Sequence, residues 1–298
     1  MKIFDNKTKI KGVMPPKYKN HNQSKNIPSF IYGTAWKEKA TTELVELAIE
    51  SGFRAIDTAN QNKHYKEPLV GKALLNVEKR GIPRKKLWLQ SKFTSIGGQD
   101  HVIPYDKKAN IETQILQSFD STLNNLHTDY LDSYLLHGPY NYPFLGEEDF
   151  IAWETLEKLY KSGKTKSIGI SNVNFEQIRM LVENSKIKPM MVQNRCYASQ
   201  QWDKEVREFC QKHKIHYQGF SLLTANMHVL MNPAISEIAK KYIVSPEHVI
   251  FRFAYQIGMI PLTGTSNKNH MISDLTIFDF KLSNHEMSQL EAGHVIEG

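Results

Sequence analysis

The 298-residue sequence contains little cysteine and no long apolar run. Its two cysteines, Cys196 and Cys210, form neither a CxxC motif nor a zinc-ligand spacing. A disulfide-rich secreted domain is therefore excluded, no metal site is expected, and the cysteine usage fits a reducing cytoplasm. No segment of about 18 consecutive apolar residues occurs, so we expect no membrane-spanning helix.

Positive charge is in excess, but it is concentrated at one end of the chain. The formal net charge is +7, and residues 1–25 contain seven lysines against one aspartate. Residues 1–26 are therefore predicted to form a basic arm, either disordered or a plug at one end of a barrel, and nucleic-acid binding is not expected. Residues 27–298 contain no linker rich in Pro, Gly or Ser, so we expect them to form one domain.

From residue 29 onward, segments with the period of a strand alternate with segments with the period of a helix. The predicted strands are 29–33, 53–57, 86–92, 130–137, 166–171, 190–194, 216–220 and 259–262. The predicted helices are 41–52, 67–79, 110–126, 150–162, 176–184, 203–213, 233–242, 246–257 and 283–293. This alternation predicts an α/β protein with a single (β/α)8 TIM barrel, and a chain of two doubly wound domains is the alternative.

Polar residues at the ends of barrel strands are candidates for chemistry, because active sites of such barrels lie there. Asp57, Tyr65, Lys92 and His137 are four such residues, although a helix cap, a packing aromatic or a core histidine would explain three of them singly. Lys92 is different, because a lysine at the end of an apolar strand is costly to bury unless a carboxylate neutralises it. Asp57, at the end of the neighbouring strand, is the expected partner.

Seven segments of the chain carry a family resemblance. They are GTAW at 33–36, GFRAIDTA at 52–59, HYKEPLVGKAL at 64–74, LWLQSKF at 87–93, DYLDSYLLHGP at 129–139, GKTKSIGISN at 163–172 and IFDFKLSNHEM at 277–287. In their order and setting they resemble the aldo-keto reductases, over about residues 27–292. The resemblance implies an NAD(P)H-dependent oxidoreductase that reduces an aldehyde or ketone at the C-terminal face of a barrel, without a Rossmann fold. The sequence contains no GxGxxG motif.

The resemblance implies a catalytic tetrad of Asp57, Tyr65, Lys92 and His137. Tyr65 would give a proton to the alkoxide formed by hydride addition, and Lys92, held by Asp57, would lower the pKa of the phenol. His137 would donate a hydrogen bond to the carbonyl oxygen and orient the substrate. The seven residues between Asp57 and Tyr65 make a longer segment than the family usually has, so His64 is the alternative proton donor.

The resemblance also implies where the cofactor binds. The carboxamide of the nicotinamide would contact Ser171, Asn172 and Gln193, and its ring would stack on Phe220. After the predicted strand 259–262, residues 263–266 lead into a helix and offer backbone N–H groups and hydroxyls to a phosphate. The complete set of implied contacts is Thr34, Ala35, Ser171, Asn172, Gln193, Phe220, Ser221, Leu222, Thr224, Thr263, Gly264, Thr265, Ser266, His270 and Asp274.

Two of these positions bear on the choice between NADPH and NADH. Members that prefer NADPH usually carry a lysine and an arginine where this chain has Gly264 and His270, and Asp274 stands in place of an asparagine. The loss of a bidentate arginine weakens phosphate recognition. Lys268 is a nearby compensating cation, so we expect NADPH rather than NADH.

Aromatic residues are expected to line the substrate site. Trp36 and Tyr140 are the predicted contacts for a small carbonyl compound, and the protein is expected to be a monomer or weak oligomer. Two other functions stay open. One is a cofactor-binding redox-sensing or regulatory subunit without significant turnover, and the other is a barrel aldolase with a Schiff base on Lys92, against which Asp57 argues.

Overall fold

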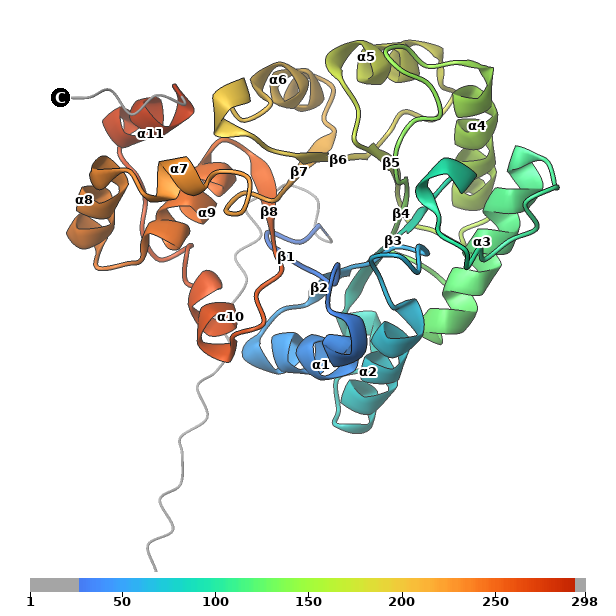
Figure 1. Ribbon diagram of the computed structural model, residues 1–298, viewed down its shortest axis with the longest axis horizontal. Coiled ribbons are helices and arrows are strands. Elements are labelled where there is room, and N and C mark those ends of the chain that lie inside the picture. The colour runs from blue at the N-terminus through green and yellow to red at the C-terminus, as the bar shows by residue number, and fades with distance from the viewer. Residues whose placement is uncertain (1–26, 293–298) are drawn as a thin grey trace, which may run out of the picture.

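The computed structural model describes residues 27–292, and in it eight parallel strands close into a barrel (Figure 1). Each strand pairs with the next along the chain, and the last pairs with the first. The strands are β1 (Ile31–Gly33), β2 (Ala55–Asp57), β3 (Trp88–Phe93), β4 (Ser133–Leu136), β5 (Ile168–Ser171), β6 (Met191–Arg195), β7 (His216–Phe220) and β8 (Met259–Thr263). This order confirms the predicted (β/α)8 TIM barrel. The predicted basic arm, residues 1–26, lies outside the described residues.

Helices surround the barrel as an outer layer (Figure 1). They are α1 (Thr41–Ser51), α2 (Glu67–Lys79), α3 (Ile111–Leu126), α4 (Glu147–Lys161), α5 (Phe175–Asn184), α6 (Lys204–Lys212), α7 (Met227–Leu230), α8 (Pro233–Tyr242), α9 (Pro246–Gln256), α10 (Lys268–Asp274) and α11 (Asn284–Glu291). Short 3-10 helices lie in the connections: η1 (Glu38–Ala40), η2 (Arg84–Lys86), η3 (Ile96–Gly98) and η4 (Ala198–Gln200). None of the helices within residues 27–292 has the length and apolar character needed to cross a bilayer.

Local signals explain why some helix bounds agree with the prediction. α2 and α8 have the predicted bounds, and both have a proline in the first turn, where its missing N–H costs no hydrogen bond. At α8 the side chain of Asn232 also accepts a hydrogen bond from the N–H of Ala234. α7 was not predicted, because its four residues are too short to show a helical period.

The barrel interior changes in polarity along β3. Alternate residues of β3 show the change, because side chains of one strand face the same side at every second position. Trp88 belongs to an apolar cluster inside the barrel, Gln90 belongs to a cluster of buried amides, and Lys92 lies deepest in the polar region. A second and larger apolar core lies between the strands and the helices. The interior is thus apolar toward the amino ends of the strands and polar toward their carboxyl ends.

Candidate active site

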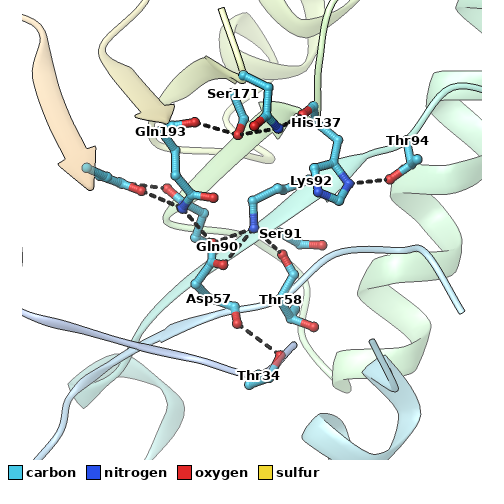
Figure 2. Close-up of polar contacts among 12 residues, drawn as sticks. Thr34, Asp57, Thr58, Gln90, Ser91, Lys92, Thr94, His137, Ser171 and Gln193 are labelled. Carbon is cyan, nitrogen blue, oxygen red and sulfur yellow. Dashed lines mark hydrogen bonds and ion pairs between the residues drawn. The ribbon is translucent and has the colours of Figure 1, made fainter. Parts of the chain in front are cut away.

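Asp57 and Lys92 form a buried ion pair at the carboxyl ends of β2 and β3 (Figure 2). The Lys92 Nζ atom is 2.7 Å from both carboxylate oxygens of Asp57 and 2.9 Å from the carbonyl oxygen of Thr58. Lys92 is 0% exposed and Asp57 is 3% exposed. Burial lowers the pKa of the Lys92 ammonium, and Asp57 opposes that shift. Three acceptors occupy the three N–H bonds of the ammonium, so its orientation is fixed.

Three buried glutamines support the Asp57 carboxylate. Its Oδ1 atom accepts hydrogen bonds from Nε2 of Gln90 at 2.7 Å and from Nε2 of Gln193 at 3.1 Å. Gln218 connects the two, because its Oε1 atom accepts from both of these amides. The sequence analysis missed Gln90 and Gln218. Their positions, two residues before Lys92 and two before Phe220 on inward-facing strand positions, are the signal that could have found them.

Tyr65, and not His64, is directed toward Lys92. The Lys92 Nζ atom lies 5.4 Å from the centroid of the Tyr65 ring. The same ring meets the His137 ring edge to face, with centroids 5.8 Å apart. The His64 ring instead lies against Trp36, with centroids 4.0 Å apart. The long segment after Asp57 thus brings Tyr65 to the ammonium and leaves His64 at the aromatic side chain of the preceding loop.

The expected effect of Lys92 on the Tyr65 phenol is not found. Burial raises the pKa of Tyr65, and the nearby Asp57 carboxylate raises it further. The prediction that Lys92 lowers this pKa is therefore wrong. The physical reason is that burial disfavours the phenolate and the Asp57 carboxylate adds to this, so the two together outweigh the effect of an ammonium paired with Asp57 at 2.7 Å. At neutral pH Tyr65 is consequently a protonated phenol.

His137 follows β4 and is electrically neutral. Its backbone N–H donates to the carbonyl oxygen of Phe93 at 2.8 Å, which extends the pairing of β3 and β4 by one residue. Its Nδ1 atom is 2.7 Å from Oγ1 of Thr94. Burial, assisted by the positive charge of Lys92, lowers the pKa of His137 to about 3. The ring therefore carries one proton at neutral pH and can donate through one nitrogen only.

Two amide oxygens beside His137 could accept hydrogen bonds from a carboxamide. Asn172 donates from Nδ2 to the carbonyl oxygen of His137 at 2.8 Å and to Oγ of Ser171 at 3.1 Å. Ser171 donates from Oγ to the carbonyl oxygen of Gln193 at 2.5 Å (Figure 2). Within residues 27–292, neither Oδ1 of Asn172 nor Oε1 of Gln193 accepts a hydrogen bond. A carboxamide donates two N–H bonds, so the donor set of a nicotinamide fits these acceptors.

Phe220, at the end of β7, offers a partly exposed ring next to this amide cluster. The guanidinium carbon of Arg195 lies 5.6 Å from the Phe220 ring centroid. Ser221 follows with a positive φ of 57°, and its carbonyl oxygen accepts from the N–H of Ala225 at 3.0 Å. In this turn the side chain of Leu222 is buried, whereas Thr224 is exposed. Four of the predicted cofactor contacts, Phe220, Ser221, Leu222 and Thr224, therefore lie at the end of β7 and in the turn that follows it.

Three predicted cofactor residues have side chains that bind within the protein. Oγ1 of Thr34 donates to the carbonyl oxygen of Asp57 at 3.0 Å. Oγ1 of Thr263 donates to Oδ2 of Asp274 at 2.9 Å, and the other Asp274 oxygen is 3.6 Å from Nε2 of His248. Asp274 is 4% exposed. Thr34 thus supports the end of β2, and the Asp274 carboxylate at the end of α10 contacts residues of β8 and α9.

The remaining predicted residues lie at the mouth of the barrel or beside it. Gly264, Ser266 and His270 are exposed around the start of α10, and Thr265 accepts a hydrogen bond at its carbonyl oxygen from Oη of Tyr32 at 2.9 Å. Ala35 is partly exposed, and Trp36 is 68% exposed. The Tyr140 hydroxyl is buried without a hydrogen-bond partner among the described residues. Trp36 therefore offers an exposed aromatic ring. Tyr140 offers a hydroxyl that no described residue binds.

Lys37 reaches the loop between β8 and α10, and the sequence analysis missed it. Its Nζ atom donates to the carbonyl oxygen of Gly264. A Cβ atom at Gly264 would lie 3.6 Å from this Nζ, an ordinary contact distance, so the ammonium lies directly beside Gly264. Burial lowers the pKa of Lys37. Its position directly after the GTAW segment is the one signal in the sequence for a role of Lys37. The contact with Gly264 could not be predicted, because the two residues lie far apart along the chain.

The chain is similar to a set of known reductases. The model of the aldo/keto reductase family matches residues 30–293. The chain is 32% identical over 252 residues to glyoxal reductase of Bacillus subtilis, covering 84% of this chain and 82% of that protein. It is 32% identical over 255 residues to 9,11-endoperoxide prostaglandin H2 reductase of Trypanosoma cruzi, covering 84% and 81%. A solved aldo/keto reductase of Brucella melitensis is 28% identical with a TM-score of 0.75, covering 90% of this chain and 95% of that one.

Proposed function

Because this chain belongs to the aldo/keto reductase family of NAD(P)H-dependent oxidoreductases acting on small carbonyl compounds, we propose that Asp57, Tyr65, Lys92 and His137 are its catalytic residues. The observation that carries the proposal is the arrangement around one ammonium group. Lys92 is buried, bonded to Asp57 at 2.7 Å, and 5.4 Å from the centroid of the Tyr65 ring. Among the described residues, no other lysine is buried.

The proposed reaction uses the two protonation states described above. A bound nicotinamide supplies the hydride. His137, neutral because its pKa is about 3, donates a hydrogen bond to the carbonyl oxygen and so favours the negative charge that develops there. Tyr65, kept protonated by its raised pKa, gives its proton to the alkoxide, which is a stronger base than a phenolate. Lys92 and Asp57 hold the phenol in position and supply a fixed local dipole.

We propose NADPH as the cofactor on the basis of Lys37 and Lys268. Lys37 occupies the space beside Gly264, and Lys268 begins α10 as an exposed residue. An ammonium binds a phosphate as a point charge, so two lysines in this loop favour a cofactor with an additional phosphate. Asn172, Gln193 and Phe220 would hold the nicotinamide, and the loop after β8 would hold the phosphate end.

The cofactor proposal is tested by titrating the intrinsic fluorescence of the protein with NADPH and NADH in parallel. The expected result is tighter binding of NADPH, with a preference that falls about tenfold in Lys37→Met, since one lost charge contact costs about 1.4 kcal/mol. Lys39→Met, a change at an exposed lysine two residues away, is the matched control and should keep the preference. Equal affinity for both cofactors in the unmodified protein would contradict the proposal.

The choice of proton donor is tested by turnover. The name of the Bacillus subtilis relative makes glyoxal the first substrate to assay, followed by aromatic aldehydes suited to the exposed Trp36. Tyr65→Phe should lower kcat by about 10²- to 10⁴-fold, the usual contribution of a positioned acid. His64→Phe should change it by less than about tenfold, because that ring contacts Trp36. The reverse pattern would identify His64 as the proton donor.

The two alternative functions predict different outcomes in the same assays. A regulatory subunit would bind the cofactor without turning over any carbonyl compound. An aldolase would form a Schiff base on Lys92 that borohydride traps, yet all three N–H bonds of this ammonium are already donated to Asp57 and Thr58. The geometry therefore favours reduction over Schiff-base chemistry. A monomer or weak oligomer stays the expected assembly.

A further inference from the structure

Thr94 is the first residue after β3, and its hydroxyl has one polar neighbour. Oγ1 of Thr94 is 2.7 Å from Nδ1 of His137 (Figure 2). Among residues 27–292 no other group forms a hydrogen bond with this hydroxyl. Thr94 is 4% exposed, so water does not replace a missing partner easily. This contact therefore determines where the hydroxyl hydrogen of Thr94 and the ring proton of His137 lie.

The backbone of Thr94 is fixed by two further side chains. Its carbonyl oxygen accepts a hydrogen bond from Oη of Tyr105 at 2.8 Å and from Nε2 of Gln99 at 3.2 Å. Tyr105 also packs against Phe93, with ring centroids 5.5 Å apart. The hydroxyl is thus carried by a residue that is held on two sides, and its position relative to His137 follows from the packing of the segment after β3.

The direction of the hydrogen bond follows from the inventory of donors and acceptors. If Nδ1 carried the proton and donated to Thr94, the hydroxyl hydrogen would be buried without an acceptor. A doubly protonated ring would have the same defect, and burial beside Lys92 already disfavours it. If the hydroxyl donates to a bare Nδ1, its hydrogen has an acceptor, and the ring proton is left at a nitrogen that is not buried away from solvent. The ring proton then lies on Nε2, which has no hydrogen-bond partner among the described residues.

We infer that Thr94 is a positioning residue, whose hydroxyl donates to Nδ1 of His137 and holds this ring as the Nε2–H tautomer. Only this tautomer presents a donor from Nε2 to a carbonyl oxygen. The tautomer itself follows from contacts within the protein, whereas its use in substrate binding rests on the proposed function. Thr94 touches neither substrate nor cofactor in this proposal and acts through His137 alone.

The tautomer is measured directly in the cofactor-free protein by ¹⁵N NMR of labelled histidine. The chain has 12 histidines, and the His137 signals are identified as those lost in His137→Gln. The expected result near pH 7 is a protonated Nε2 and an unprotonated Nδ1 that receives a hydrogen bond. Thr94→Val removes the hydroxyl at nearly constant volume and should give a mixture of tautomers. Thr94→Ser should restore the unmodified spectrum.

A kinetic readout separates positioning from a structural role. Thr94→Val should lower kcat about tenfold with an unchanged dissociation constant for NADPH, and Thr94→Ser should recover most of the loss. Thr155→Val is the matched control, since Thr155 is a buried threonine of α4 that bonds only within its own helix, to Ile151. It should change neither the His137 spectrum nor kcat.

A protonated Nδ1 in the unmodified protein would overturn the inference, and this measurement does not depend on whether Thr94→Val folds. An unchanged His137 tautomer in folded Thr94→Val would overturn it as well. If the spectra are as expected but no carbonyl compound is turned over by the unmodified protein, the proposed function fails while the tautomer stands. The two failures are therefore distinguishable.

Discussion

The two ends of the barrel both carry lysines, but their lysines have different surroundings. At the amino ends of the strands, a cavity of about 600 Å³ is lined by Lys85, Lys86 and Lys214, among others. These three lysines are exposed and form no ion pair within residues 27–292. At the carboxyl ends, Lys92 is fully buried and bonded to Asp57 at 2.7 Å.

The comparison teaches that the surroundings of a lysine matter more for chemistry than its presence beside a cavity. An exposed ammonium is screened by water and ions, so its field has little effect a few ångströms away. A buried ammonium with fixed acceptors keeps its orientation. Its charge also affects neighbouring groups more strongly, because little water screens it. The large cavity at the amino end is therefore the less promising region, and the smaller set of buried contacts at the carboxyl end carries the candidate chemistry.

The largest expected effect tests this comparison with one lysine from each end. Lys92→Met should lower kcat by at least about 10³-fold, because Tyr65 loses its fixed charged neighbour. It should also destabilise the fold by about 3–5 kcal/mol, since Asp57 remains as an unpaired buried charge. Lys214→Met, at the amino end, should change both quantities very little. Turnover is followed by NADPH absorbance and stability by denaturant unfolding.

A double variant separates the two effects of Lys92. Lys92→Met combined with Asp57→Asn removes both charges, so much of the lost stability should return while turnover stays lost. If turnover returned together with stability, the ion pair would be a structural feature only. In that case the two ends of the barrel would not differ in the way proposed.

The second prediction concerns the direction of the reaction as a function of pH. Reduction uses Tyr65 as a protonated phenol, whereas oxidation of an alcohol needs its phenolate. Because burial and Asp57 raise the pKa of Tyr65, the phenolate is scarce at neutral pH and becomes more abundant as the pH rises. The rate of alcohol oxidation should therefore increase up to at least about pH 10, whereas reduction should be nearly constant from about pH 6 to 9. A plateau of the oxidation rate near neutral pH would contradict the raised pKa.

The third and smallest prediction uses a second buried carboxylate at the carboxyl end. Glu67 is 2% exposed and accepts hydrogen bonds from Ser91, Thr122 and Asn125, and it forms no ion pair with any residue from 27 to 292. Burial raises its pKa to about 7, from an ordinary value of 4.5. The folded state therefore binds a proton that the unfolded state has released between these two pH values.

Stability should consequently fall as the pH rises from about 4.5 to about 7, by at most a few kcal/mol, because each unit of pKa difference is worth about 1.4 kcal/mol. Glu67→Gln should remove most of this dependence in denaturant unfolding measured at both pH values. An unchanged pH dependence in Glu67→Gln would show that other groups cause it.

Sequence reasoning predicted the barrel and the identity of its polar strand ends. The period of apolar residues located all eight strands, and the bounds of α2 and α8 agreed with the prediction. It also selected Lys92 and Asp57 as partners, since a buried lysine at a strand end requires a carboxylate nearby. It was wrong about the pKa of Tyr65, because burial of the phenol and its proximity to Asp57 raise this pKa, and no spacing in the sequence states either one.

Contacts between segments far apart in the chain could not be predicted. Lys37 at Gly264 and Thr94 at His137 join residues whose distance along the chain carries no information about their distance in space. The buried amides show the same limit, since Gln90 and Gln218 look like ordinary strand residues until the barrel closes. In each case the deciding quantity is a distance of about 3 Å across the barrel.

The sequence by itself determined the order of strands and helices and which polar residue types stand where strands end, because periodicity and composition are local properties of the chain. The tertiary structure decided which side chain of the His64–Tyr65 pair meets Lys92, that the phenol stays protonated, and which nitrogen of His137 carries its proton. The physical reason is that desolvation and hydrogen bonding depend on what surrounds a group in space, and eight strands contribute to that environment only when the barrel is closed.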